Sequence, residues 1–151
     1  MSRVYTLEHE QWVPGIPDQI FPFFSDARNL EKITPPWLSF CVRSVAPEPI
    51  VAGTLIQYQL RVHGVPFRWT TKITEWNPPH SFVDVELSGP YAQWIHTHRF
   101  EPRDGGTRMM DRVEYALPFG LLGSLAHVLL VKRDVERIFD YRRRKIAEIF
   151  R

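Results

Sequence analysis

The stretch SLAHVLLVKRDVERIFDYRRRKIAEIF, residues 124–150, decides how this chain folds. It contains neither glycine nor proline, so it is predicted to form one unbroken helix. At a rise of about 1.5 Å per residue, this helix is about 40 Å long. Apolar residues recur along it at spacings of three and four, which is typical of a helix with one buried face. The predicted stripe consists of Val128, Val131, Val135, Ile138, Ile146 and Ile149, and Arg142 interrupts it.

The opposite side of this predicted helix is strongly basic. The residues on that side are Lys132, Arg133, Arg137, Arg143, Arg144 and Lys145. We interpret them as a solvated face, whose arginine-rich end also suits the negative end of the helix dipole. The alternative is a weak contact with an anionic membrane surface or with a partner protein.

The residues before the helix predict one strand, two short helices and then six more strands. Residues 4–13 alternate as a strand does, and residues 16–24 and 26–33 form the short helices. The later strands are predicted at residues 40–46, 54–62, 67–76, 81–87, 93–101 and 107–117. Consecutive strands joined by short turns favour an antiparallel sheet. The predicted fold class is therefore α+β, with the long helix packed on one face of the sheet.

The composition is typical of a soluble globular protein and excludes several classes of function. With 151 residues, 44% apolar content and 24% charge, residues 1–151 are predicted to form a single domain. The net charge of +2 is too small to argue for a nucleic-acid partner. The single cysteine, Cys41, excludes an internal disulfide framework and a cysteine-rich metal site, and we expect a cytoplasmic location. No stretch is long and apolar enough to predict an integral membrane segment.

Aromatic residues are unusually frequent in this sequence. They make up 13% of the chain and include five tryptophans and ten phenylalanines. Such side chains supply large rigid surfaces, either for a core or for walls around an apolar ligand.

Two histidines and one aspartate are the strongest candidates for chemistry. His96 and His98 share a strand face with Trp94 and Phe100, because side chains alternate along a strand. Asp111 belongs to the more apolar face of the next strand, so it is predicted to point inward as well. A buried aspartate beside a buried histidine makes a charge-assisted pair. The favoured interpretation is a structural polar network, and the alternative is a general base for a cyclisation or dehydration.

Two further acids alternate along a neighbouring strand. Asp84 and Glu86 are opposite in phase to Val83, Val85 and Leu87. The favoured interpretation places the apolar three in the core and the acids in solvent. The alternative turns the acids inward, where they could meet the two histidines.

A metal site is not predicted. His96 and His98 stand at alternate positions of one strand and could share a metal ion. No recognisable motif nearby supplies a third ligand, so neither a metal nor a cofactor is expected.

Three segments carry a resemblance to a known superfamily. They are IPDQIFPFFSDARNLEKITP (residues 16–35), GTLIQY (53–58), and GPYAQWIHTHRF with GTRMMDRVEY (89–100 and 106–115). With these segments and this order of elements, the whole chain resembles the START-like (SRPBCC) helix-grip superfamily, the polyketide cyclase/dehydrase and lipid-transport group. The resemblance implies a curved antiparallel sheet of six or seven strands wrapped around the C-terminal helix, with a cavity between them.

The resemblance also implies binding or transport of a small hydrophobic or aromatic ligand, such as a lipid, a quinone or a polyketide. Two alternatives stay open: a polyketide-type cyclase or dehydrase, and a protein-interaction module acting on a partner enzyme. The catalytic candidates for the cyclase are His96, His98, Asp111 and Tyr115. The predicted ligand-binding residues are Tyr58, Leu60, Trp69, Phe82, Trp94, His96, His98, Val113, Tyr115, Val131, Val135 and Ile138.

Overall fold

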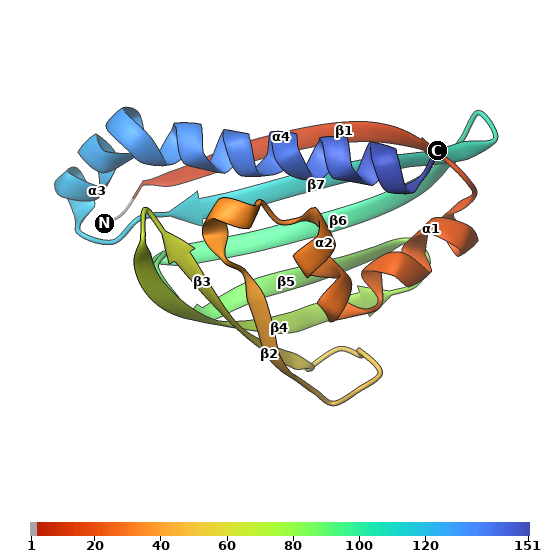
Figure 1. The fold of residues 1–151 in the computed structure, drawn as a ribbon, viewed down its shortest axis with the longest axis horizontal. Helices are drawn as coiled ribbons and strands as arrows, with labels where there is room; N and C mark the ends of the chain where they lie inside the picture. Colours follow the sequence, from red (N-terminus) through yellow and green to blue (C-terminus); the bar gives the residue numbers. More distant parts are fainter. Residues whose placement is uncertain (1–2) are drawn as a thin grey trace.

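The computed structural model describes residues 3–151, except for the side chains of residues 121, 124 and 128. It confirms the α+β class and the order of elements (Figure 1). Strand β1 (Val4–Pro14) leads to α1 (Pro17–Phe24), the 3-10 turn η1 (Ala27–Asn29), α2 (Leu30–Ile33) and the 3-10 turn η2 (Pro36–Leu38). The other strands are β2 (Cys41–Ala46), β3 (Leu55–Val62), β4 (Val65–Asn77), β5 (Ser81–Ser88), β6 (Gln93–Arg103) and β7 (Gly106–Ala116). The C-terminal helix comprises α3 (Gly120–Ala126), the π-helical turn η3 (His127–Val131) and α4 (Lys132–Ile149).

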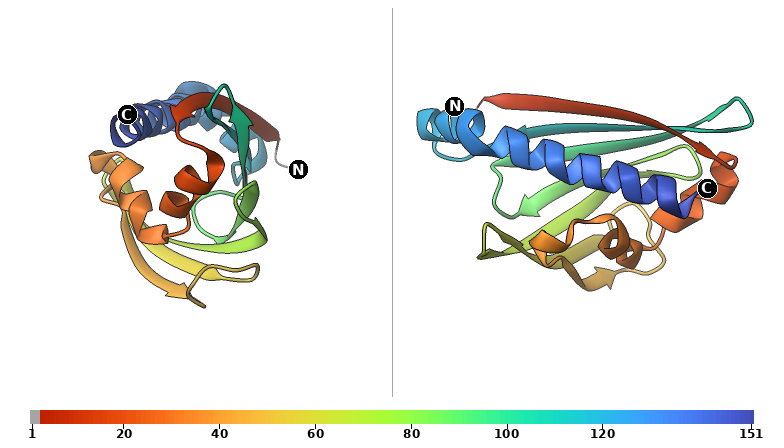
Figure 2. Two further views of the ribbon diagram at one scale, coloured as in Figure 1. Left: turned by 90° about the vertical axis from the view of Figure 1, so that its right-hand side faces the viewer. Right: turned by 45° about the horizontal axis from the view of Figure 1, so that its top comes forward.

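Within residues 3–151, seven strands form one antiparallel sheet in the order β1-β7-β6-β5-β4-β3-β2. Only β1 departs from the sequence order, and it pairs with β7 along its whole length. Register shifts between Val42 and Ser44 and between Ile73 and Glu75 interrupt the ladders of β2 and β4. Because such irregularities bend a strand, the sheet curves around one side of α4 (Figure 2).

The C-terminal helix begins earlier than predicted. Phe119 and Gly120 have positive φ values of 72° and 52°, and this turn directs the chain from β7 into α3. The helix therefore starts at Gly120 rather than at Ser124, and it continues through one π-helical turn into α4. No helix in the described part of the chain has the length and apolar character needed to cross a membrane.

The buried face of α4 differs from the predicted stripe. Its buried residues are Val135, Phe139, Arg142 and Ile146. These positions follow a four-three-four spacing, so they form one continuous line on the helix. Ile138 is only partly buried and Ile149 is 40% exposed, so both lie at the margin of this face. The predicted member Val128 lies outside the described side chains.

The short helix α1 closes the sheet at the end remote from α3 (Figure 1). Its Phe21 and Phe24 rings pack against Phe100 of β6, with centroids 5.1 and 5.3 Å apart. Helix α2 contacts α4, and the turns on either side of it, η1 and η2, contact β2 and β3. These short elements therefore connect the β2–β3 edge of the sheet to the long helix. The concave face is therefore covered, and the space that remains inside it is enclosed by several elements.

Candidate functional site

A cavity of about 730 Å³ lies between the concave face of the sheet, the short helices and the C-terminal helix. Its volume is in the range of pockets that hold drug-sized ligands. Apolar and aromatic side chains dominate its lining, and the polar groups are concentrated on β5, β6 and α4. The predicted residues on its wall are Tyr58, Leu60, Trp69, Phe82, Trp94, His96, His98, Val131 and Ile138.

Three predicted lining residues, Val113, Tyr115 and Val135, do not line the cavity. They pack with Phe139 in an apolar cluster, because the helix covers β7 directly at this point. The Tyr115 hydroxyl is hydrogen-bonded to Nε2 of His127 at 2.7 Å, and burial raises the pKa of Tyr115 to about 12. Tyr115 is therefore not placed to act on a molecule in the cavity.

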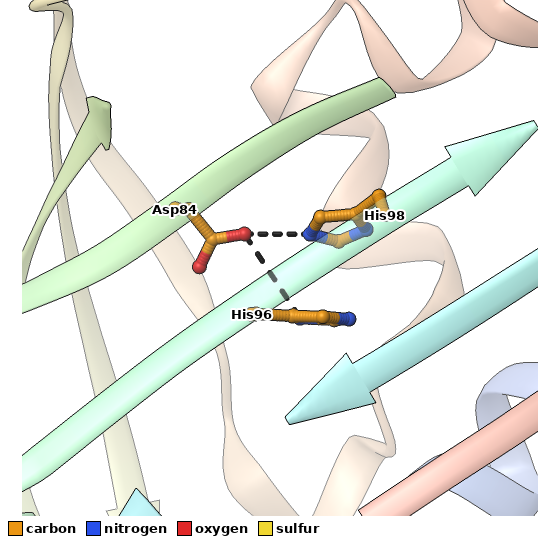
Figure 3. Close-up of side chains that lie close together, drawn as sticks. All are labelled: Asp84, His96 and His98. Carbon is orange, nitrogen blue, oxygen red and sulfur yellow. Dashed lines mark hydrogen bonds and ion pairs between the residues drawn. The ribbon is translucent and has the colours of Figure 1, made fainter. Parts of the chain in front are cut away.

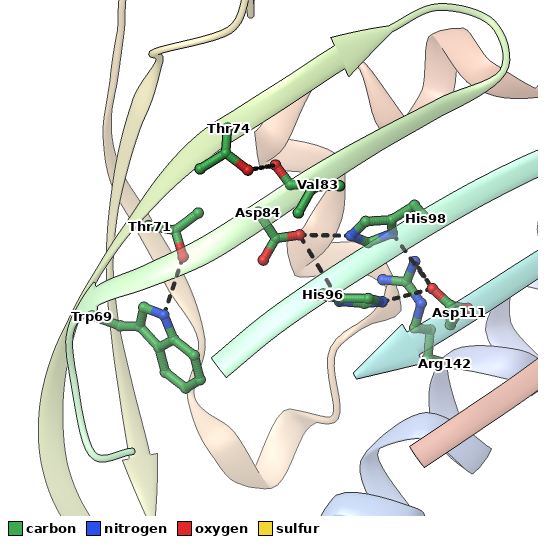
Figure 4. Close-up of polar contacts among 9 residues, drawn as sticks. All are labelled: Trp69, Thr71, Thr74, Val83, Asp84, His96, His98, Asp111 and Arg142. Carbon is green, nitrogen blue, oxygen red and sulfur yellow. Dashed lines mark hydrogen bonds and ion pairs between the residues drawn. The ribbon is translucent and has the colours of Figure 1, made fainter. Parts of the chain in front are cut away.

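Buried and partly buried polar residues from three strands and the helix meet beside the cavity, and we call them the polar cluster (Figure 4). Its members are Asp84, His96, His98, Asp111 and Arg142. Nε2 of His96 lies 2.7 Å from Oδ1 of Asp111, so the predicted inward histidine–aspartate pair is present. Nε2 of His98 lies 2.6 Å from Oδ2 of Asp84. The two imidazole rings stack with centroids 3.6 Å apart. Asp84 lies at one edge of the stacked rings and Asp111 lies at the opposite edge.

Strand β5 turns inward the face that we expected to be solvated. Asp84 lines the cavity and Glu86 is partly buried, whereas Leu87 is 57% exposed. The favoured assignment of Val83, Val85 and Leu87 to the core and of the acids to solvent was therefore wrong, and Phe82, in phase with the acids, is the buried apolar residue of this strand. The physical reason is that histidines of β6 supply hydrogen-bond donors opposite Asp84, which reduces the cost of burying its charge.

Arg142 is the member of the polar cluster that sequence reasoning missed. Its Nη2 atom lies 3.6 Å from Oδ1 of Asp111, and its guanidinium lies 5.6 Å from the ring centroid of Phe24. The signal was present in the sequence, because Arg142 occupies a position between Ile138 and Ile146 where the helix face is otherwise apolar. An arginine at a buried helix position requires a buried acidic partner, and Asp111 is that partner.

The polar cluster balances its charges. Burial disfavours ionised Asp84, but the hydrogen bond with His98 and nearby positive charges lower its pKa. Burial also opposes ionisation of Asp111, yet the charge of Arg142, the hydrogen bond with His96 and the close approach of His98 hold its pKa well below the usual range. Burial lowers the pKa of His96, whereas in His98 burial is outweighed by the two neighbouring aspartates, one of them hydrogen-bonded, and the pKa is raised. Two carboxylates thus face one arginine and one readily protonated histidine.

The structure supplies the third potential metal ligand that the sequence did not reveal. Asp84, His96 and His98 each offer one ligand atom, and these atoms lie within 4.8 Å of one another (Figure 3). The lack of a third ligand was the reason to predict no metal, and that reason does not hold.

Next to the polar cluster, the cavity has an aromatic wall made of Tyr58, Trp69, Tyr91 and Trp94. Trp69 and Trp94 meet edge to face at 5.3 Å between centroids, and Tyr91 lies 4.8 Å from Trp94. The indole N–H of Trp69 donates to the hydroxyl of Thr71 at 3.1 Å. Because this N–H already has a partner, Trp69 offers the cavity its apolar ring surface.

One polar contact ties the β3–β4 turn to the long helix across the cavity. Nε2 of His63 lies 2.7 Å from Oδ2 of Asp134, and both residues line the cavity. The His63 side chain is 54% exposed, so this contact lies at the outer margin of the site. We call it the mouth bridge.

Comparisons with known proteins agree with this architecture. The chain matches the family model described as polyketide cyclase / dehydrase and lipid transport over residues 13–139. The uncharacterized protein Rv1546 of Mycobacterium tuberculosis is 32% identical over 97 residues, covering 63% of this chain and 67% of that protein. TTHA0849 of Thermus thermophilus has 22% identity and a TM-score of 0.67, over 94% of this chain and 97% of that one. The Zhui aromatase/cyclase of Streptomyces sp. R1128 has 16% identity and a TM-score of 0.75, over 97% and 93%. At these identities the two structures show likeness of fold alone.

Proposed function

Because the chain belongs to the polyketide cyclase/dehydrase and lipid transport family, we propose that residues 1–151 act as one domain that binds a small hydrophobic or aromatic ligand in the cavity. The observation that carries this proposal is the cavity of about 730 Å³ with its largely apolar lining. A site of this kind combines apolar walls with a few polar groups that orient the ligand.

The distribution of polar groups supports a ligand with two chemically different ends. The aromatic wall offers ring surfaces for an apolar or aromatic body. Farther along β5 and β6, Asp84, His96 and His98 line the cavity and can exchange hydrogen bonds with a hydroxyl or carbonyl oxygen. Quinones, polyketides and sterol-like lipids all have this combination of a flat apolar body and a terminal oxygen.

The direct test is to fill the cavity and measure binding. Leu60 is buried on the cavity wall, and Leu60→Trp should occupy part of the space and weaken binding of anilinonaphthalene sulfonate by about tenfold or more. Leu87 is 57% exposed on the same sheet, so Leu87→Trp is the matched control and should leave binding unchanged. Native mass spectrometry of the wild-type protein should also reveal a co-purified small molecule. Equal binding of the fluorescent probe by wild type, Leu60→Trp and Leu87→Trp would contradict the proposal.

A second candidate function is a cyclisation or dehydration catalysed by the polar cluster. If Nε2–H of His96 donates to Asp111 at 2.7 Å, then Nδ1 carries the lone pair and can accept a proton. Nδ1 lies 3.9 Å from Oδ2 of Asp84 and belongs to a residue that lines the cavity. A neutral imidazole oriented by a buried carboxylate is the arrangement expected of a general base.

Kinetics and binding together separate the two candidates. If His96 is the base, His96→Gln should abolish conversion of a poly-β-ketone substrate while the protein still binds the fluorescent probe. Unchanged conversion by this variant would exclude the assignment of His96. A wild-type protein that binds the probe and converts no such substrate is a binding protein only.

We propose further that the protein exchanges its ligand at an anionic membrane surface. The exposed apolar residues at the α3 end are Phe119, Leu122, Leu125, Leu129 and Leu130. Exposed basic residues follow at Lys132 and Arg133, and this combination suits the interface of an anionic bilayer. Wild-type protein should sediment with phosphatidylserine vesicles, and the double variant Leu122→Ser, Leu129→Ser should not. If wild-type protein stays in solution, this exchange route is wrong.

A further inference from the structure

Three ligand atoms converge beside the cavity in a geometry that the ligand-binding function does not require. Oδ2 of Asp84 lies 2.6 Å from Nε2 of His98 and 3.9 Å from Nδ1 of His96 (Figure 3). All three residues line the cavity, and both histidines are buried. The histidines occupy alternate positions of β6, and Asp84 faces His96 directly in the register of β5. The three side chains are thus held by paired strands in the sheet interior.

The remaining nitrogen of each imidazole faces a second carboxylate. Oδ1 of Asp111 lies 2.7 Å from Nε2 of His96 and 3.4 Å from Nδ1 of His98. Asp111 is held in turn by Arg142, whose Nη2 lies 3.6 Å away (Figure 4). A carboxylate behind a histidine ring is the usual support of a metal-binding histidine, because it fixes the orientation of the ring.

We propose that Asp84, His96 and His98 bind one divalent transition-metal ion of the zinc type, with an open coordination position facing the cavity. Two imidazoles and one carboxylate are the ligand set of catalytic zinc sites and of related transition-metal sites. The proposal goes beyond binding of a hydrophobic ligand, because it assigns to the cavity wall a Lewis acid that could polarise a ligand oxygen.

The distances fit this ion with small side-chain movements. Metal–ligand bonds of about 2.0–2.1 Å in a tetrahedral site place ligand atoms about 3.3 Å apart. The two distances from Asp84, 2.6 and 3.9 Å, lie on either side of this value. Small movements of Asp84 would bring both separations to this value. The two imidazole rings, which stack with centroids 3.6 Å apart, would also turn out of the stack so that each ring plane contains the ion. Calcium and magnesium fit less well, because both prefer oxygen ligands.

The charges around the site also constrain its fourth ligand. Arg142 compensates the charge of Asp111, so Asp84 alone faces the two positive charges of the ion. An anionic donor in the open position, such as hydroxide or a deprotonated ligand oxygen, brings the charges closer to balance. Because the three protein ligands line the cavity, this donor would come from the cavity side.

The test uses Co²⁺ as a spectroscopic probe and Zn²⁺ as its competitor. Wild-type protein treated with a chelator and then titrated with Co²⁺ should develop visible absorption bands of a four- or five-coordinate site at one ion per chain. An equimolar amount of Zn²⁺ should abolish these bands, because zinc binds such sites more tightly. If the wild-type protein binds neither ion, the proposal is wrong whatever the variants do.

Variants identify which residues hold the ion. Asp84→Asn and His98→Gln should each weaken Co²⁺ binding by about 100-fold or more, and Asp111→Asn by about 10- to 100-fold. His80 is exposed and does not line the cavity, so His80→Gln is the matched control and should bind as wild type does. Metal binding that survives Asp84→Asn in a folded protein would overturn the assignment. Binding of the fluorescent probe to chelator-treated protein is measured in parallel, so a failure of the metal site and a failure of the cavity proposal are distinguishable.

Discussion

Two neighbouring parts of the same cavity lining are built on opposite principles. The aromatic wall on β3, β4 and β6 consists of rings that touch one another, and the polar group of Trp69 is satisfied locally by Thr71. The polar cluster on β5, β6, β7 and α4 consists of charges whose partners come from distant parts of the chain, such as Asp111 and Arg142. The wall supplies area and shape, and each ring contributes largely on its own. The polar cluster works only as a complete set, because each buried charge depends on the others.

The comparison predicts different responses to mutation. Losing one ring of the wall enlarges a cavity that already exists, so the surrounding packing changes little. Losing one member of the polar cluster leaves another charge buried without its partner, and such losses are among the most destabilising single changes.

The largest effect is expected for Asp111→Asn in metal-free protein. This change removes the negative charge that faces Arg142 and both histidines, so the free energy of unfolding should fall by about 3 kcal/mol. For a chain of this length that corresponds to a decrease in Tm of about 6–12 °C. Urea denaturation and calorimetry measure both quantities.

The control for Asp111→Asn is Glu114→Gln on the same strand. Glu114 makes a surface ion pair with Arg112 at 3.2 Å, and surface pairs of this kind contribute less than about 1 kcal/mol. A loss of similar size in both variants would mean that the polar cluster is no more interdependent than the protein surface.

The same contrast explains what could be predicted from the sequence. The long helix and the strands were predictable because their periodicities are local properties of the chain. The wall residues Tyr58, Trp69 and Trp94 were predictable too, since large aromatics on the apolar phase of a strand face inward. The general position of the cavity followed from the resemblance to the superfamily rather than from any single motif.

The polar cluster was predicted only in part. His96 and Asp111 are on apolar phases of neighbouring strands, so their pairing followed from the pattern. Asp84 and Arg142 are charged residues at buried positions, and a pattern rule assigns such residues to the surface. Their burial depends on partners supplied by other elements, so it becomes visible only when the elements are assembled.

The second prediction concerns the aromatic wall. Trp69→Ala should reduce the free energy of unfolding by about 2 kcal/mol, less than the 3–5 kcal/mol typical of a tryptophan in a solid core, because its ring borders the cavity. Affinity for the fluorescent probe should fall about tenfold, since ring contact is lost. Trp12 is 50% exposed and lies outside the cavity, so Trp12→Ala should keep the probe affinity. A destabilisation by Trp69→Ala that matches Asp111→Asn would remove the distinction between the two parts of the lining.

The third prediction concerns pH and the loop between β5 and β6. Oε1 of Glu86 accepts a hydrogen bond from the backbone N–H of Tyr91 at 3.1 Å, while its buried Oε2 has no partner among the described residues. Burial raises the pKa of Glu86 from 4.5 to about 7. Between these values the unfolded chain releases the proton and the folded protein keeps it, so stability falls as pH rises through this window.

Replacing Glu86 by glutamine removes that pH dependence. Glu86→Gln and wild type should be equally stable near pH 4. Above pH 7 the variant should be more stable by on the order of 1 kcal/mol, because solvent around the partly exposed Glu86 side chain reduces the energetic cost of its charge. Glu75 is exposed on β4, and Glu75→Gln should follow the wild-type pH profile. Parallel profiles for wild type and Glu86→Gln would show that burial of Glu86 carries no energetic cost.

The smallest effect on stability is expected at the mouth bridge, which belongs to neither the aromatic wall nor the polar cluster. The contact between His63 and Asp134 is partly exposed, so His63→Ala should change the free energy of unfolding by less than about 1 kcal/mol. Its effect should be kinetic, because the bridge ties the β3–β4 turn to α4 across the cavity and its loss frees the turn to move. Stopped-flow fluorescence should show faster release of the bound probe, whereas Lys145→Ala, which removes the surface pair with Glu148, should leave release unchanged. Unchanged release from His63→Ala would mean that the ligand leaves by another route and that the β3–β4 turn does not control its exit.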